Sequence, residues 1–425
     1  MDHGTHMTRT HGSRTPRSGP GAWLRARSLG LLAWVATLAS LALTACDAGP
    51  NGGPGAQVES TSAVSATPGS TGDGVDPLSV AIPSDHPLGT PEPGEVTIIA
   101  MPDIQWYSLT EATIPDDRED GRLAEFLSHF EGGPQAPHIL REMQAWILEH
   151  AREQRILFVS YVGDIVERGG APESRPRWEV TRESLDQIHG RIPYGIAVGN
   201  HDMDTATGDT RLFQEFFGAD RYVGFDWYRD SFGNNENSAQ RIPLDGGGHL
   251  LFLHLTCNAP EEVLEWADGV LSAHADDHVF ISTHILLGPV ERHSGPVTPE
   301  IETGLMRWTK CYGERGLDAQ ETWDRLFRRH PQIRAVLSGD QSYSQALHEV
   351  REGDAGNPIL LMMTDYKQVS RDGYLRVIRY NPATGAMRVI TWSPVLGQTL
   401  ESTGIVPDPA KHRFDFIPEE APALR

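Results

Sequence analysis

Two stretches of the chain decide its fold: RILFVSYVGDIVERGG at residues 155–170 and IAVGNHDMD at residues 196–204. In each stretch an apolar run ends in Gly, and carboxylate, amide or imidazole side chains follow directly. Gly, Asn and Asp also favour turns, so one such ending is explained by loop closure alone. The rest of the sequence is therefore needed to distinguish simple turns from a ligand-binding site.

Strand-like and helix-like stretches alternate along the chain on both sides of these two motifs. Apolar runs typical of strands lie at 96–101, 155–166, 194–200, 248–257, 278–284 and 333–340, and helical spacing of apolar residues covers 138–154, 177–190, 260–274 and 319–330. This alternation predicts one layered α/β domain with largely parallel inner strands. The strand-like runs over residues 344–394 predict mixed or antiparallel pairing at its end.

Five of the predicted strands run into polar residues at their carboxyl ends. These residues are Asp103 and Gln105, then Asp164, then Asn200, His201 and Asp202, then His284, and finally Asp340 and Ser342. In open α/β sheets, ligands bind beyond the carboxyl ends of the strands. Five such endings at one edge of one sheet would gather oxygen and nitrogen ligands in a single cleft. This composition suits hard or borderline divalent cations.

The order of the motifs resembles the calcineurin-like metallophosphoesterases, whose pattern is D-x-H, GD-x-x-x-x-G, GNH-D or GNH-E, a lone His and GH-x-H. The matching stretches are PDIQ, GDIVERGG, GNHD, STH and SGDQS, and the resemblance covers residues 94–395. It looks closest to exported bacterial members whose first motif carries Gln. The resemblance implies a layered α/β/β/α sandwich with mixed sheets and the hydrolysis of a phosphomonoester or phosphodiester.

The resemblance also implies the metal ligands. Asp103 would hold a first metal ion, and Asp164 would bridge both ions because its two oxygens can be shared. Asn200 and His284 would bind the second ion. Two cations at that distance neutralise the phosphoryl group and activate a water for in-line attack.

Three positions depart from the family pattern. Gln105 stands where His is usual, and Asp340 and Ser342 stand where GH-x-H has its two histidines. Gln105 would offer its carbonyl oxygen to the first ion and Asp340 a carboxylate to the second. An oxygen-rich set with one imidazole favours Mn²⁺ or Mg²⁺, with Fe²⁺, Ca²⁺ and Zn²⁺ as alternatives, at one or two ions per chain.

The catalytic roles follow from the same resemblance. His201 would act as general acid at the leaving-group oxygen, Glu167 would orient it, and Arg168 would clamp the phosphoryl oxygens. The departures leave two functions open: an active hydrolase with an altered site, and a catalytically silent relative that binds a phosphorylated ligand or a partner at the cell envelope.

The N-terminus predicts export. A basic stretch precedes the apolar run LGLLAWVATLASLALTAC, as in a signal peptide covering residues 1–45. LTAC at residues 43–46 resembles the lipobox of bacterial lipoproteins, in which the Cys is lipidated, so we expect Cys46 to anchor the protein outside the cytoplasmic membrane. Residues 46–93, rich in Gly, Pro, Ser and Thr, predict a flexible tether. Residues 396–425 follow the domain as a C-terminal extension.

The charge of the chain excludes one class of partner. Removal of residues 1–45, which carry five Arg and one Asp, changes the formal net charge from -22 to about -26. Such a chain is not expected to bind nucleic acid through bulk electrostatics, and it would meet the membrane through its lipid only.

Three other features are left open by the sequence. His254 lies inside the apolar run LLFLHLT and is interpreted as a core histidine. Cys257 and Cys311 form either a disulfide or two separate buried thiols. TDYKQ at residues 364–368 resembles a late motif of the exported relatives and is a candidate border of the site.

Overall fold

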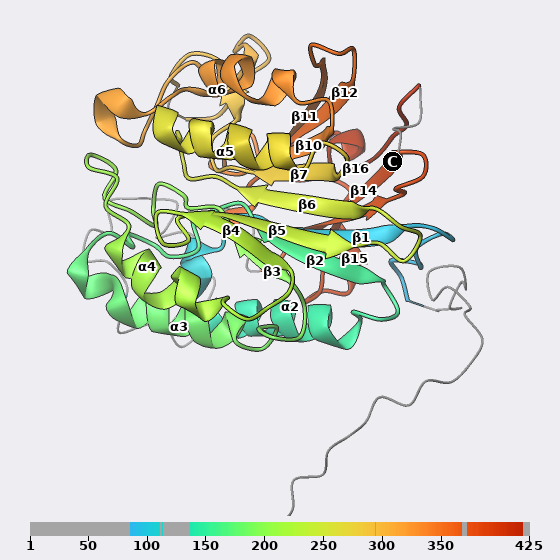
Figure 1. The fold of residues 1–425 in the computed structure, drawn as a ribbon. Helices are drawn as coiled ribbons and strands as arrows, with labels where there is room; N and C mark the ends of the chain where they lie inside the picture. The colour runs from blue at the N-terminus through green and yellow to red at the C-terminus, as the bar shows by residue number, and fades with distance from the viewer. Residues whose placement is uncertain (1–85, 111–112, 114–135, 294, 368–371, 420–425) are drawn as a thin grey trace, which may run out of the picture. The chain divides into compact units, whose positions relative to one another are not determined.

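The computed structural model describes residues 86–110, 113, 136–293, 295–367 and 372–419 (Figure 1). The predicted signal peptide, Cys46 and all of the tether up to residue 85 lie outside these residues. Within the described part, no helix is both long enough and apolar enough to cross a membrane.

Seven strands of the described chain form a first sheet. They are β1 (Val96–Met101), β2 (Ile156–Tyr161), β3 (Tyr194–Ile196), β13 (Leu375–Tyr380), β14 (Met387–Ser393), β15 (Gln398–Thr399) and β16 (Arg413–Phe416). Strands β1, β2 and β3 are parallel, whereas β13 joins β1 antiparallel. Both β15 and β16, which belong to the expected C-terminal extension, pair with β14 and widen this sheet.

Seven further strands form a second sheet. They are β4 (Tyr228–Phe232), β5 (Asn237–Pro243), β6 (His249–His254), β7 (His278–Ser282), β10 (Ile333–Ser338), β11 (Ala346–Glu352) and β12 (Pro358–Thr364). Its inner strands β6, β7, β10 and β12 are parallel, and the outer pairings are antiparallel. A small two-stranded sheet joins β8 (Leu287–Pro289) and β9 (Thr303–Leu305).

The two sheets pack face to face, and the alternation of side chains along β1 shows how. Val96, Ile98 and Ala100 join the apolar cluster between the sheets, whereas Ile99 and Met101 face the cluster shared with the helices. Every residue of β1 is buried, which explains why its sequence reads as a continuous apolar run rather than an alternating one.

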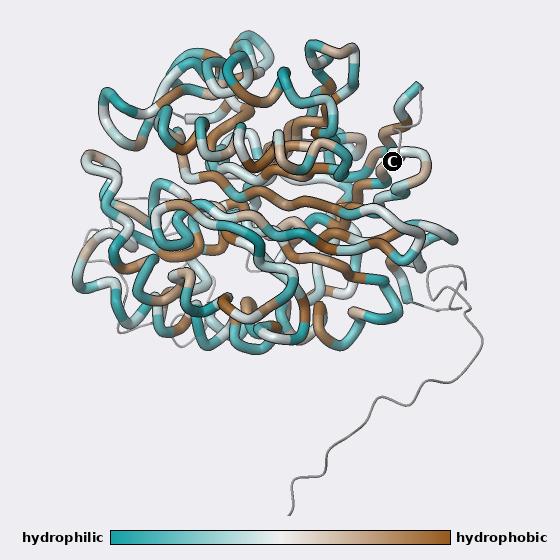
Figure 2. The backbone as a smooth tube through the Cα atoms, in the orientation of Figure 1, coloured by the Kyte–Doolittle hydropathy of each residue, from teal (hydrophilic) through white to brown (hydrophobic). Residues whose placement is uncertain are grey.

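Helices cover the outer faces of both sheets (Figure 1). They are α2 (Ala136–Glu149), α3 (Arg175–Leu185) and α4 (Arg211–Phe217) on the first sheet, and α5 (Glu261–Ala273) and α6 (Ala319–Arg325) on the second. Short 3-10 helices are η1 (Gln105–Ser108), η3 (Pro172–Ser174), η4 (Ala219–Arg221), η5 (Gly313–Arg315), η6 (Phe327–Arg329) and η8 (Pro409–Lys411). Figure 2 shows the strands mostly hydrophobic between more hydrophilic outer segments. The layered α/β/β/α class with mixed sheets is therefore confirmed.

One expectation about the sheets is wrong. The five polar strand ends do not share one sheet, because β1, β2 and β3 belong to the first sheet and β7 and β10 to the second. They still meet, because the facing strands run in the same direction. Phe158 of β2 stacks on Phe252 of β6 with ring centroids 3.7 Å apart, and two residues further Ser160 bonds to His254 at 2.8 Å. Alternating strands and helices are compatible with one wide sheet or two stacked ones, so this pattern could not distinguish them, whereas the family resemblance implied two.

Candidate active site

The GD and GN turns of the two opening motifs interlock at the end of β2 and β3. Asp164 adopts a left-handed φ of 51°, and a Cβ added to Gly199 would lie 2.2 Å from both the Asp164 amide nitrogen and its Oδ1. Only glycine leaves room for that approach. Asp202 ties the same loops together, since its carboxylate accepts backbone N–H bonds from Ile165, Val166 and Gly199 at 2.8 to 3.0 Å.

Asp164 and His284 form the centre of the site. His284 Nε2 lies 3.1 Å from Asp164 Oδ1, and both side chains are fully buried. The other ring nitrogen of His284, Nδ1, lies 2.9 Å from the Val162 carbonyl oxygen. If Nδ1 carries the proton, this bond fixes the ring and directs the Nε2 lone pair at the carboxylates. Ligand atoms of Asp103, Asp164 and His284 all lie within 4.8 Å of one another.

Several buried acceptors at this site are left without a hydrogen-bond partner among the described residues: Asn200 Oδ1, His284 Nε2 and Gln105 Oε1. For His284 Nε2, the approach to Asp164 is short but not aligned as a hydrogen bond. An unsatisfied buried polar group costs about 1–3 kcal/mol, so native proteins rarely keep three together. Asp164, Asn200 and His284, which we call the second metal position, therefore fit a divalent cation.

The first metal position, defined by Asp103, Gln105 and Asp164, contains different chemistry. Lys367 Nζ donates to Asp103 Oδ2 at 2.8 Å and to Asp365 Oδ2 at 3.0 Å. The Asp340 amide nitrogen lies 3.2 and 3.3 Å from the two Asp103 oxygens. Gln105 turns its amide nitrogen toward Asp164 Oδ2 at 3.1 Å. Protein donors thus already surround Asp103, which fits a second divalent cation poorly.

Asp340 is also paired by a lysine. Its Oδ1 forms an ion pair with Lys310 Nζ and lies 3.7 Å from His284 Nε2. The loop needs Gly339, because a Cβ there would lie 2.1 Å from Asp103 Oδ1. The motif that replaces GH-x-H therefore delivers a carboxylate whose charge is already compensated.

His201 and Glu167 form a pair beside the metal positions. His201 Nδ1 lies 3.1 Å from Glu167 Oε1, and His201 Nε2 lies 3.9 Å from Asp164 Oδ2. Burial acts to lower the pKa of His201, but the carboxylates of Glu167 and Asp164 outweigh it and raise the pKa above its usual value. The two carboxylates thus favour the protonated form of the imidazole, whose Nε2 faces the cluster. About a third of its side chain, 34%, is exposed, which marks the open side of the site.

Arg168 lies on that open side. Its side chain is 47% exposed, and its Nε lies 3.9 Å from Glu167 Oε1. A long, partly exposed guanidinium next to the acid pair is of the kind that binds phosphoryl oxygens.

The buried charges perturb one another strongly. Burial, and after it the Asp365 carboxylate, raise the pKa of Asp103 to about 8 although Lys367 opposes them. Burial would lower the pKa of His284, but Asp164 and Asp103 overcome it and raise the pKa to about 10. The cluster therefore holds protons when no metal is bound, and metal binding must release some of them.

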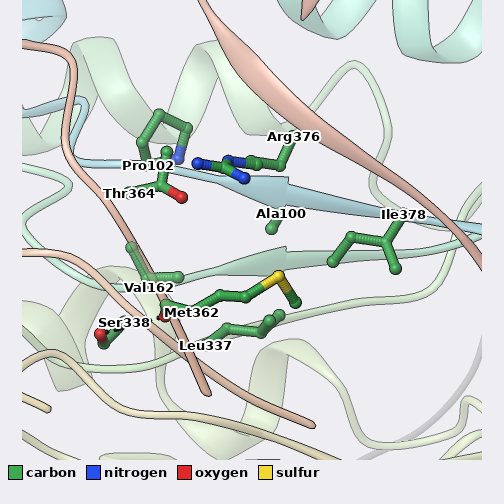
Figure 3. A pocket seen from close by; sticks show the side chains of 9 residues that line it. All are labelled: Ala100, Pro102, Val162, Leu337, Ser338, Met362, Thr364, Arg376 and Ile378. Carbon is green, nitrogen blue, oxygen red and sulfur yellow. Dashed lines mark hydrogen bonds between the residues drawn. The ribbon is translucent and has the colours of Figure 1, made fainter. Parts of the chain in front are cut away.

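A cavity of about 10 Å³ lies behind the site, between the two sheets. Figure 3 shows its lining, where Pro102, Ser338 and Thr364 come from the strand ends that carry the site and Arg376 from β13. This volume corresponds to at most a single water molecule. This cavity is too small for a substrate, whereas His201 and Arg168 are the partly exposed members of the site.

Sequence reasoning missed two residues of this site, Lys310 and Asp365. Lys367 was a candidate border of the site within TDYKQ, and the structure places it against Asp103. Tyr366 of that motif points elsewhere, with its hydroxyl 2.8 Å from His412 Nδ1. One signal was present: the whole chain has three lysines, and two of them reach this site.

Several known proteins are similar to this chain in sequence or in structure. The Bacillus subtilis (strain 168) protein "Uncharacterized protein YvnB" is 26% identical over 266 residues, or 61% of this chain. The chain spans only 18% of that relative's length. A dimetal phosphatase from Danio rerio aligns at 11% identity with a TM-score of 0.43, covering 72% of this chain and 98% of that one. A purple acid phosphatase from yellow lupin (Lupinus luteus) aligns at 12% identity with a TM-score of 0.42, covering 72% and 52%.

The family itself is identified by sequence. Residues 96–342, more than half of the chain, match the calcineurin-like phosphoesterase family. The match begins at β1 and ends at Ser342, so it includes the strand ends that carry Asp103, Asp164, Asn200, His284 and Asp340, but not Asp365 and Lys367 after β12. The chain belongs to the calcineurin-like phosphoesterases.

Proposed function

We propose that this protein is a metal-dependent phosphoester hydrolase. The observation that carries the proposal is the pairing of two neighbouring groups: the unsatisfied second metal position, and the acid pair His201–Glu167 beside it. A site that only binds phosphate has no need of an imidazole that a carboxylate holds in place beside the metal position. When bound, a divalent cation supplies Lewis-acid stabilisation of the charge that builds up on the phosphoryl group.

The residues of this chain then have separate tasks. Asp164, Asn200 and His284 would hold the cation. His201 carries a proton at Nε2 and donates it to the leaving-group oxygen as the phosphorus–oxygen bond breaks and a water adds to phosphorus. Glu167 holds the ring in position through Nδ1, and Arg168 contributes a fork of donors for phosphoryl oxygens.

The test is hydrolysis of a chromogenic phosphomonoester and a chromogenic phosphodiester by the purified chain with Mn²⁺, Mg²⁺, Ca²⁺, Fe²⁺ and Zn²⁺ in turn. We expect activity with Mn²⁺ or Mg²⁺ that a chelator removes. The absence of hydrolysis with every ion, in a folded protein, would contradict the proposal.

A second candidate is a catalytically silent envelope protein that binds a phosphorylated ligand. The specific observation in its favour is that Lys367, not a metal ligand, contacts Asp103. Binding of a phosphorylated ligand without its hydrolysis would identify this alternative.

We also propose that the protein acts outside the bacterial cytoplasmic membrane, held by a lipid on Cys46. The basic stretch, apolar run and LTAC motif support this placement. In cells, Cys46→Ser should move the protein from the membrane fraction to the soluble fraction. Wild-type protein that begins at another residue and is freely soluble would contradict it.

A further inference from the structure

We propose that Lys367 takes the place of one of the two metal ions, so that the cleft binds a single divalent cation. This inference deepens the proposed function because it concerns the same site. It starts from geometry: the Lys367 ammonium is buried and lies 2.8 Å from Asp103 Oδ2 and 3.0 Å from Asp365 Oδ2. Asp103 is the residue to which the family resemblance assigns the first metal. An ammonium therefore sits on the carboxylate that a metal ion would need.

The balance of charge supports one cation rather than two. Four buried carboxylates and two ammonium groups make up the ion-paired cluster: Asp103, Asp164, Asp340 and Asp365, with Lys310 and Lys367. Their formal sum is two negative charges, which one divalent cation neutralises. A second divalent cation would leave the buried cluster with excess positive charge, which the interior does not tolerate.

Neighbouring acidic groups do not change this balance. Asp202 has its oxygens bonded by three backbone N–H groups, and Glu167 is paired with the His201 imidazole. Asp202 is thus bonded to the backbone, and one oxygen of Glu167 is bonded to the imidazole. Both carboxylates therefore have partners outside the ion-paired cluster.

The presence of lysine rather than arginine at position 367 also supports a single cation. The chain has three lysines against 33 arginines, so nearly all of its positive charge is guanidinium. A guanidinium is a broad planar fork, whereas an ammonium is a compact point charge that fits where an ion would lie. Two of the three lysines lie in this cluster, and the third, Lys411, is part of η8 far along the chain.

The expected ligands of the single cation are Asp164, Asn200 and His284. Their acceptors Asn200 Oδ1 and His284 Nε2 have no hydrogen-bond partner in the described chain, in contrast to the carboxylate oxygens of Asp103. The two halves of the cleft are thus chemically different. In one half the Asp103 carboxylate is bonded by protein donors, and in the other two ligand atoms have no partner among the described residues.

The experiment measures stoichiometry rather than activity. The chelator-treated full chain is titrated with Mn²⁺ by calorimetry, and bound metal is counted by elemental analysis after dialysis. We expect one Mn²⁺ per chain in the wild type. Lys367→Met removes one positive charge and frees Asp103 and Asp365, so it should gain a second, weaker binding event. The matched control Lys411→Met should bind one ion like the wild type.

Two outcomes would overturn the inference: two ions bound by the wild type with similar affinity, or no ion bound at all. A third is a folded Lys367→Met variant with the same single binding event as the wild type. If that variant does not fold, electron paramagnetic resonance of the wild type with excess Mn²⁺ distinguishes one bound ion from two. Two ions in one cleft couple magnetically, whereas a single ion does not, so a coupled signal would contradict the inference. A chain that binds one ion but hydrolyses no ester would refute the proposed function and leave this inference standing.

Discussion

This protein has two buried polar clusters, one between the two sheets and one at the ends of their strands. The clusters differ in charge and in how well their polar atoms are hydrogen-bonded. The inter-sheet network consists of Ser160, Gln240, His254 and Ser282, which face one another in the middle of the sandwich. The strand-end cluster consists of Asp103, Asp164, His284, Asp340, Asp365, Lys310 and Lys367, which lie one to three residues beyond strands of the two sheets or, for Lys310, on a loop. Apart from the partly exposed Lys310, the members of both clusters are buried, yet one cluster is neutral and the other is charged.

In the inter-sheet network the polar atoms of His254 are satisfied. His254 Nε2 lies 2.8 Å from Ser160 Oγ and its Nδ1 lies 2.9 Å from Gln240 Oε1, while Ser160 also contacts Ser282 at 2.6 Å. Burial lowers the pKa of His254 to about 3, so the ring is neutral. This is the core histidine that the apolar run LLFLHLT favoured, and its role is to join the sheets.

The strand-end cluster keeps acceptors that no protein donor satisfies, next to charges that the protein compensates only in part. The comparison shows how a buried polar group that stabilises the fold can be distinguished from one that belongs to a ligand-binding site. A histidine with both nitrogens bonded by the protein completes the fold, whereas a histidine with one nitrogen fixed and the other aimed at carboxylates is prepared for a ligand.

The comparison is tested by replacing the central histidine of each cluster, and the larger effect is expected at His284. His284→Ala should abolish Mn²⁺ binding and lower kcat by roughly 10³-fold or more, because metal stabilisation is worth several kcal/mol and 1.36 kcal/mol is a factor of ten. Calorimetric titration and phosphoester hydrolysis measure the two effects. Retention of full activity would show that His284, like His254, only completes the fold.

The acid pair next to the cluster should give a somewhat smaller effect. His201→Ala should lower kcat roughly 10²- to 10³-fold while the bound metal stays at the wild-type level, since positioned proton transfer is worth that much and His201 is not a ligand. A chromogenic ester with a very good leaving group needs little help from an acid, so the loss should shrink with that substrate. An equal loss with both leaving groups would contradict a role in proton donation.

The pH dependence of stability separates the two clusters further. A buried histidine with a lowered pKa stabilises the fold above its unfolded pKa of about 6.5, and this contribution is lost as pH falls toward about 3. At pH 4.5 the loss from His254 should be about 2–3 kcal/mol. Denaturant unfolding at pH 7.5 and 4.5 should therefore show a smaller acid loss in His254→Gln than in the wild type. Identical acid losses would mean that His254 is not neutral in the fold.

The smallest effect is expected from His254→Gln at neutral pH. Loss of part of the Ser160 and Gln240 bonding should reduce the free energy of unfolding by about 1–3 kcal/mol. The value of kcat and the Mn²⁺ stoichiometry should stay unchanged, because no atom of His254 is directed at the strand-end cluster. A change in metal binding would show that the two clusters are coupled through Ser160 and Ser282.

Local patterns were sufficient for much of this protein. Apolar runs and helical spacing predicted the strands and helices because each element has to bury one face or both. The motifs GDIVERGG and GNHD led to Asp164, Asn200, Glu167 and His201 through the resemblance to a known family, and the turns that carry these motifs need Gly where the backbones approach closely. Their placement after successive strands was enough to expect one cleft.

Only the tertiary structure decided what fills that cleft. The stacking of two sheets, rather than one wide sheet, brings β2 under β6 and β7 and so sets His284 against Asp164. Cys257 and Cys311, left open by the sequence, are both buried and free. Lys367 reaches Asp103 across 264 positions of the chain, and Lys310 reaches Asp340 from another loop. Ion pairs between such distant positions produce no pattern in the local sequence. Only the folded chain shows which carboxylates are paired with an ammonium group.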